Sequence, residues 1–143
     1  MFKHILLPID GSKLSEEAAR NAIEFAKSIN ASVTGFHVIV PDHSLMIPRP
    51  RDTDEQYYED SRHQAEGYLD AVGRVAHEAG VPYETDYVIA SHPYEAIIRA
   101  AEAKGCDLIV MASHGRHGVQ GLLIGSETNK VLTHTKLPVL VLR

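Results

Sequence analysis

A glycine-rich stretch near the carboxyl end of the chain holds the residues best suited to chemistry. It runs over 112–126 and reads ASHGRHGVQGLLIGS. Glycine permits close backbone approaches that a side chain would forbid, and Gly125-Ser126 is typical of the start of a helix. Amides at a helix start lack intrahelical acceptors and converge on one point, so they bind anions. The stretch could therefore bind a phosphate, with the Ser126 hydroxyl as a further donor and Arg116 as a mobile charge.

The same stretch also fits a flexible crossover loop in which Ser126 only caps the following helix. The lysine of a P-loop is missing, and so is a G-x-G-x-x-G pattern. A helix dipole alone contributes about 0.3–1 kcal/mol, so phosphate binding needs several amides acting together. The residues alone leave both interpretations open.

Histidine and serine side chains offer further alternatives. His114 and His117 lie three residues apart and could suggest zinc together with another histidine, but they fall on a loop without a nearby cysteine. Ser12 and Ser126 lie outside the G-x-S-x-G pattern of a serine nucleophile, so we interpret them as turn and cap. We predict neither a metal site nor a catalytic residue.

The elements that must position these residues are indicated by hydrophobic periodicity. Short apolar or β-branched runs predict strands, and apolar residues three or four apart predict helices. The predicted strands cover residues 4–9, 32–40, 83–89, 107–112 and 138–142. The predicted helices begin at an N-cap Ser15, at a capping box of Thr53 and Gln56, at Pro93 in a first helical position, and at Ser126.

Strict alternation of strands and helices predicts an α/β fold. We expect one domain over residues 1–143, with a doubly wound five-stranded parallel sheet and helices on both faces. A ligand then binds at the carboxyl ends of the strands, where the strand order reverses. Two loops follow such strand ends, 10–12 and 113–126, so we expect the site between them.

Composition excludes several classes of protein. The 14 basic and 19 acidic residues give a net charge of −5 with histidine neutral, so no basic field is available for nucleic acid. No apolar run approaches the roughly 20 residues of a membrane helix. The first residues lack a signal-peptide pattern, and a single cysteine, Cys106, excludes an intrachain disulfide. We expect a cytoplasmic protein without nucleic acid or membrane partners.

The motifs resemble the nucleotide-binding branch of the universal stress protein family. That branch has a glycine, two residues, a second glycine, nine residues, and then Gly-Ser or Gly-Thr; here Gly115 is the second glycine and Gly125-Ser126 closes the pattern. The opening ILLPIDGS, the segment SHGR and the ending PVLVL also look like family hallmarks, over essentially the whole chain. The resemblance implies a Rossmann-like fold of the adenine nucleotide alpha hydrolase type. It also implies an adenine nucleotide, ATP or AMP, across the carboxyl edge of the sheet.

The resemblance assigns parts of the nucleotide to positions in this sequence. The adenine and ribose would be flanked by Pro8, Ile9 and Asp10, with Val38 beside the base. The ribose side would be lined by Met111 and Ala112, and the phosphates surrounded by Gly115, Gly125, Ser126 and Thr128. The chemistry agrees, because a short acid can accept from a ribose hydroxyl or help to hold Mg²⁺ beside ATP, and the apolar side chains suit a purine.

Two positions depart from the family pattern. Ala112 replaces the first glycine of the motif, and Glu127, which we retain among the binding residues, stands where the family often has a neutral residue. A carboxylate beside a triphosphate is repulsive, although an acid in the first turn of a helix is otherwise favourable. These departures leave open a nucleotide with fewer phosphates and, as an alternative function, a nucleotide-free interaction module.

The last predicted strand is apolar and is expected at a sheet edge, where unpaired backbone groups invite association. The resemblance implies that it pairs with its two-fold mate in a homodimer, the commonest symmetry of soluble oligomers. The alternative is a strand covered by the final helix. The resulting expectation is a dimeric stress-response module that binds an adenine nucleotide, contacts protein partners of unknown identity and hydrolyses ATP slowly at most.

Overall fold

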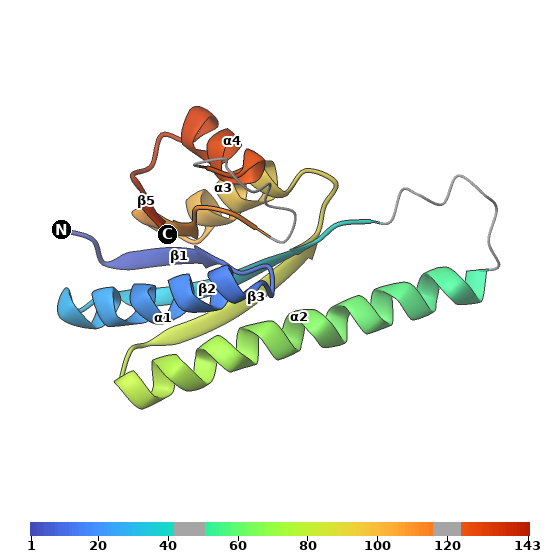
Figure 1. Ribbon diagram of the computed structural model, residues 1–143, viewed down its shortest axis with the longest axis horizontal. Helices are drawn as coiled ribbons and strands as arrows, with labels where there is room; N and C mark the ends of the chain where they lie inside the picture. Colours follow the sequence, from blue (N-terminus) through green and yellow to red (C-terminus); the bar gives the residue numbers. More distant parts are fainter. Residues whose placement is uncertain (42–50, 116–123) are drawn as a thin grey trace.

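All five predicted strands pair into one open parallel sheet with helices on both faces (Figure 1). The computed structural model describes residues 1–41, 51–115 and 124–143. In chain order the elements are β1 (His4–Pro8), α1 (Lys13–Ser28), β2 (Ser32–Ile39), α2 (Arg51–Ala79), β3 (Tyr83–Ile89), α3 (Pro93–Ala103), β4 (Leu108–Ala112), α4 (Ser126–His134) and β5 (Val139–Leu142). The predicted α/β class is therefore confirmed.

The strands lie in the order β3-β2-β1-β4-β5. β1 pairs with β2 on one side and with β4 on the other, both in parallel. The chain thus winds outward in one direction up to β3 and then returns to the far side of β1. The strand order reverses between β1 and β4, which is where a fold of this type binds its ligands.

Two hydrophobic layers hold the helices against the sheet, because successive side chains of a strand point to opposite faces. Ile5 and Leu7 of β1 pack with α1 and α2, whereas Leu6 packs on the other face with α3 and α4. All three are at most 1% exposed. β4 is buried along most of its length, as suits a strand that is covered on both faces.

Helix α1 begins earlier than the sequence indicated. Ser12, not Ser15, is its N-cap; the Ser12 hydroxyl accepts a hydrogen bond from the amide of Ser15 at 3.1 Å. The hydroxyl of Ser15 is buried and accepts from the amide of Asp10 at 3.2 Å. Both serines satisfy main-chain donors, and the earlier one has the extended backbone that a cap requires.

Helix α2 begins at Arg51, two residues before the predicted capping box at Thr53, and ends at Ala79 before Gly80, whose φ is +74°. In Figure 1 its N-terminal turns lie beyond the ends of the strands. The Tyr57 hydroxyl donates to the carbonyl of Val40 at 2.9 Å, which ties these turns to the segment after β2.

Two side chains with polar or reactive groups have structural positions in the fold. His4 has a hydrogen-bond partner, the Thr34 hydroxyl 2.7 Å from its Nε2. Cys106 is buried, and burial raises the pKa of its thiol to about 11. None of the described helices has the length and apolar character that crossing a bilayer requires.

Candidate functional site

The loop after β1 presents Asp10 at the carboxyl edge of the sheet. The amide of Ser12 donates to Oδ1 of Asp10 at 2.9 Å, so the loop folds back on the carboxylate. Gly11 between them has a φ of +82°, and the Tyr68 ring lies where a side chain at Gly11 would project. The His37 ring contacts Tyr68 edge-on at 5.5 Å. The aromatic rings thus fix the backbone that carries Asp10.

His37 also holds the main chain at Ile9, just before Asp10. Its Nδ1 lies 2.6 Å from the carbonyl oxygen of Ile9, and a carbonyl only accepts, so Nδ1 carries the proton. The Ile9 amide in turn donates to the carbonyl of Phe36 at 2.8 Å. His37 is therefore a hydrogen-bonded histidine of the sheet.

Gly115 lies directly against the carboxylate of Asp10. An ideal Cβ built on Gly115 would lie 2.6 Å from Oδ2 of Asp10, a separation that real Cβ contacts do not reach. The loops after β1 and β4 therefore meet, as the strand order predicted. The missing side chain at residue 115 is what permits this approach.

The start of α4 is attached to the same turn. The Gly125 amide donates to the carbonyl of Ser113 at 2.6 Å. The hydroxyl of Thr128, a residue that is 3% exposed, donates to the carbonyl of Ala112 at 3.0 Å. An ideal Cβ on Gly125 would lie 3.3 Å from the backbone of Ser113 and His114. Asp10, Gly115 and the first turn of α4 thus form one cluster.

The predicted cap of α4 is wrong by one residue. Gly125 is the N-cap and Ser126 is the first helical residue, because the main chain of Gly125 is still extended, at φ −68° and ψ 160°. The Ser126 hydroxyl is therefore not used as a cap, and the residue is exposed. The amides of residues 126–128 belong to the first helical turn, where no intrahelical acceptor exists. This arrangement suits an anion.

One polar atom in the cluster is buried without a partner. Nε2 of His114 has no hydrogen-bond partner among residues 1–41, 51–115 and 124–143, although Nδ1 of the same ring lies 3.1 Å from the Ser113 hydroxyl. A buried imidazole nitrogen without a partner is costly. Its position in the turn that contacts Gly125 fits a site that a polar ligand completes.

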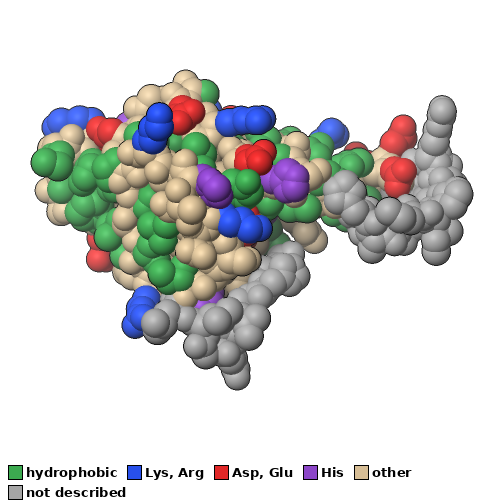
Figure 2. Space-filling view, turned by 90° about the horizontal axis from the view of Figure 1, so that it is seen from above, with side chains coloured by type: hydrophobic (Ala, Val, Ile, Leu, Met, Phe, Trp, Pro, Cys, Tyr) green, Lys and Arg blue, Asp and Glu red, His purple; other side chains and the backbone are tan. Residues whose placement is uncertain are grey.

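Glu127 is turned toward the neighbouring helix α3. Its Oε2 accepts the amide of Tyr94 at 3.1 Å, and its Oε1 lies 3.0 Å from Nζ of Lys130. Figure 2, which looks onto the layer of α3 and α4, shows acidic, basic and histidine side chains side by side. The carboxylate has two partners in this layer, so Glu127 can offer a phosphate only its main-chain amide.

The remaining predicted contacts divide into two groups. Ile9 and Met111 are 3% and 5% exposed and pack in the two hydrophobic layers, so their side chains belong to the core. Pro8 and Val38 are half-buried at the carboxyl ends of β1 and β2. Arg116 lies outside the described residues.

Sequence reasoning missed an apolar rim at this edge. Val40 follows β2, Ile89 ends β3 and Ile124 precedes Gly125; they are 41%, 42% and 39% exposed. Each stands at the end of a predicted strand or just before the helix. This position at the end of an element was the signal in the sequence that could have distinguished these exposed side chains from core side chains. Ile124 adjoins the converging amides of α4, and exposed apolar groups at this edge of the sheet suit a ligand with a flat apolar part.

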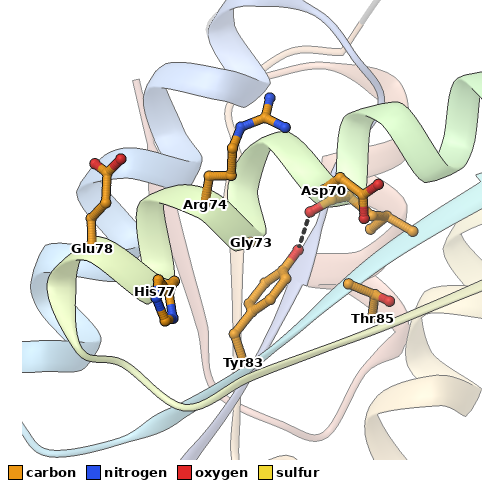
Figure 3. A pocket seen from close by; sticks show the side chains of 8 residues that line it. Asp70, Gly73, Arg74, His77, Glu78, Tyr83 and Thr85 are labelled. Carbon is orange, nitrogen blue, oxygen red and sulfur yellow. Dashed lines mark hydrogen bonds between the residues drawn. The ribbon is translucent and has the colours of Figure 1, made fainter.

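A separate depression of about 450 Å³ lies between α2 and the free edge of β3 (Figure 3). The Tyr83 hydroxyl donates to the carbonyl of Leu69 there at 3.0 Å. Burial, with the nearby Asp70 carboxylate, raises the pKa of Tyr83. Arg74 and Glu78 place opposite charges on its α2 side. These mixed charges do not converge on one point, and Tyr83 serves to fasten the edge strand.

The chain is similar to known proteins over its full length. It matches the Universal stress protein family over residues 1–143. It is 34% identical to Universal stress protein MJ0531 of Methanocaldococcus jannaschii, covering 100% of this chain and 83% of the relative. The solved structure of hypothetical protein MJ0577 superposes with a TM-score of 0.87 at 27% identity, covering 99% of this chain and 96% of that one.

Two further solved structures share the fold at lower identity. One is a universal stress protein in complex with cAMP, at a TM-score of 0.71 and 22% identity, covering 99% of this chain and 97% of the other. The second is a universal stress protein family protein of Arabidopsis thaliana with AMP bound, at 0.71 and 16%, covering 98% and 90%. The full-length match, the identity and the common fold agree. The chain belongs to the universal stress protein family.

Proposed function

We propose that the chain is a cytoplasmic universal stress protein that binds an adenine nucleotide at the junction of β1, β4 and α4. In this proposal residues 1–143 act as one domain, and nucleotide occupancy regulates contacts with protein partners. Two solved relatives of the same fold hold cAMP or AMP, which supports an adenine nucleotide as the ligand class.

One observation carries the proposal. The Asp10 carboxylate, Gly115 and the first turn of α4 meet where the strand order reverses, at distances that leave no room for a side chain at Gly115. The phosphates would bind the amides of residues 126–128 and the Ser126 hydroxyl. Asp10 would accept from a ribose hydroxyl, or hold Mg²⁺ when ATP is the ligand.

The adenine would lie toward the ends of β2 and β3. Val38 is half-buried there, and Val40 and Ile89 are exposed, so an apolar surface is available to a flat base. We propose binding as the function, with ATP turnover slow at most. The Asp10 carboxylate is engaged by the Ser12 amide and packed on Gly115, which suits a fixed ligand contact better than a base that activates water.

Isothermal titration of the purified chain with AMP, ADP and ATP, each with and without Mg²⁺, tests this proposal. We expect saturable binding of at least one nucleotide and its loss in Gly125→Leu. Gly125 has an ordinary backbone, but its Cβ position is 3.3 Å from the 113–114 backbone, so the larger side chain fills the turn. Gly67→Ala, with no atom within 4 Å of its Cβ position, is the matched control and should bind normally.

Failure of all three nucleotides to bind at millimolar concentration would overturn the proposal. That result would favour the alternative of a nucleotide-free interaction module. The replacement of the first motif glycine by Ala112 supports this alternative. Acid extraction of the purified protein, followed by mass analysis of any co-purified nucleotide, distinguishes the two independently.

We further propose that the chain forms a homodimer through β5. β5 is an edge strand of four apolar residues, all half-buried. The carbonyl oxygens of Pro138 and Leu142 accept amides at 3.0 and 2.7 Å from the β4 side. Since alternate residues of a parallel strand bond to the same neighbour, the main-chain groups of Val139 and Val141 point to the free edge.

Val141→Pro tests the dimer, because proline removes an outward amide that the pairing with β4 does not use. We expect wild type and a Val141→Ala control to have the mass of a dimer in light scattering, and Val141→Pro to be a folded monomer. A monomeric wild type, or an intact Val141→Pro dimer, would contradict pairing at this edge.

A further inference from the structure

The Glu127 side chain joins the first turns of two helices. It projects from the second residue of α4, within the turn whose amides form the proposed phosphate site. Its Oε2 accepts the Tyr94 amide at 3.1 Å, across the layer in the first turn of α3. No other side chain of the described first turn of α4 reaches α3 in this way, since the Thr128 hydroxyl donates to the end of β4.

Helix α3 needs this acceptor. Its N-cap, His92, makes no side-chain capping bond, and Pro93 at the first helical position has no amide to offer. Tyr94 therefore carries the first amide of α3 that requires an acceptor. A carboxylate at this point also satisfies the helix dipole. Glu127 thus serves as the cap of α3, although it belongs to another helix.

Further contacts fix the carboxylate in this position. Nζ of Lys130 lies 3.0 Å from Oε1 of Glu127 and 5.6 Å from the centre of the Tyr94 ring. The same ring lies 5.3 Å from the ring of His134. We name these residues the α3–α4 clasp: Tyr94, Glu127, Lys130 and His134. These two partners direct the carboxylate toward α3 and away from the amides of its own helix.

We propose that Glu127 is a positioning residue for nucleotide binding, which fastens the anion-binding turn of α4 to α3 without touching the phosphate. This inference rests on the proposed function. By linkage, a ligand that binds the arrangement of the first turn of α4 held by Glu127 must also favour the bond to Tyr94, and loss of that bond must weaken ligand binding. The negative charge acts in the opposite sense, because it repels phosphate at short range. Acceptor and charge can therefore be separated by substitution.

Two variants separate these effects. Glu127→Gln keeps an oxygen acceptor for the Tyr94 amide and removes the charge, so AMP should bind at least as tightly as to wild type. Glu127→Val removes both, and we expect AMP affinity to fall roughly tenfold, the equivalent of one lost helix cap. Glu102→Gln, which removes an exposed carboxylate from α3, is the control and should bind like wild type.

Hydrogen exchange of the Tyr94 amide, followed by NMR with and without AMP, supplies the second measurement. Exchange should slow on AMP addition in wild type and in Glu127→Gln, and not in Glu127→Val. Thermal unfolding of each variant confirms that it is folded.

The outcomes are distinct. Failure of wild type to bind AMP, ADP or ATP overturns the proposed function, and this inference with it. Two results would overturn the positioning role alone. One is normal nucleotide binding by a folded Glu127→Val, and the other is a hydrogen-exchange rate of the wild-type Tyr94 amide that AMP does not change. Tighter binding by both variants would show that Glu127 acts only as a repulsive charge.

Discussion

The contact between Gly115 and Asp10 predicts what one added methyl group does. In Gly115→Ala the new Cβ would lie 2.6 Å from Oδ2 of Asp10, below the 3.0 Å that real Cβ contacts respect. Gly115 is not among the glycines with positive φ, so alanine adds volume without backbone strain. The carboxylate must move by several tenths of an ångström. This movement strains the 2.9 Å hydrogen bond that Oδ1 of Asp10 accepts from the amide of Ser12.

The magnitude follows from two opposing effects. A hydrogen bond to a charged group contributes about 1.5–3 kcal/mol, and part or all of it is lost when the carboxylate moves. Replacing glycine by alanine restricts the unfolded chain and returns about 0.4–1 kcal/mol. We expect Gly115→Ala to lower the free energy of unfolding by about 1–2 kcal/mol, a fall in Tm of roughly 3–6 °C for a chain of this size. AMP affinity should fall as well, because Asp10 leaves its position.

A double-mutant cycle with Asp10→Ala isolates this contact. Once the carboxylate is gone, the added methyl has nothing to meet, so Gly115→Ala should be neutral or slightly stabilising in that background. Thermal unfolding of the four proteins by circular dichroism measures the coupling. Gly67→Ala, in an open helical position of α2, should raise the free energy of unfolding by about 1 kcal/mol. It is the control for a methyl group that meets no neighbouring atom. An equal cost in both backgrounds would refute the steric explanation.

Three further outcomes follow from the described contacts. Thr128→Val removes the buried hydroxyl that donates to Ala112 and should lower the free energy of unfolding in urea by about 1–3 kcal/mol; an unchanged midpoint would contradict this role. Gly35→Ala places a Cβ against the Tyr83 hydroxyl and should cost about 1–3 kcal/mol in the same assay, an effect that Tyr83→Phe should partly relieve. Burial raises the pKa of Asp107, but hydrogen bonds from two main-chain amides outweigh it and hold the pKa below its ordinary value. The stability from this depressed pKa is present above pH 4 and is lost as the pH falls through the folded pKa. The Tm of Asp107→Asn should therefore fall less than that of wild type between pH 5 and pH 2, and parallel curves would contradict the assignment.

The sequence predicted much of the fold because its patterns were strong and local. Alternating strands and helices gave the parallel sheet and placed the 10–12 loop opposite the 113–126 stretch. β3 lies at an edge of the sheet, and its apolar and polar residues alternate as expected for a strand with one face open to water. Element boundaries were harder, because neighbouring residues compete for each cap. Ser12 and Gly125 prevailed over Ser15 and Ser126 through backbone conformation, which residue type does not determine.

The candidate site was predictable in its main chain and less so in its side chains. Glycine spacing indicated where backbones meet, and Gly115 does meet Asp10. The direction of a long side chain depends on distant partners, however. Glu127 turns away because the first turn of α3, more than 30 residues earlier, lacks its own cap. The apolar sequence around Met111 likewise gave no sign of whether its side chain faces a ligand or the core.

Helix α4 is only nine residues long, too short to persist alone in water. Its start is nevertheless secured at three points: the Gly125 amide donates to the Ser113 carbonyl, the Thr128 hydroxyl donates to the Ala112 carbonyl, and the Glu127 carboxylate accepts the Tyr94 amide. The entropy of arranging its amides is therefore lost when the chain folds, not when an anion arrives. Such preorganisation lets a small ligand bind without having to order the helix itself.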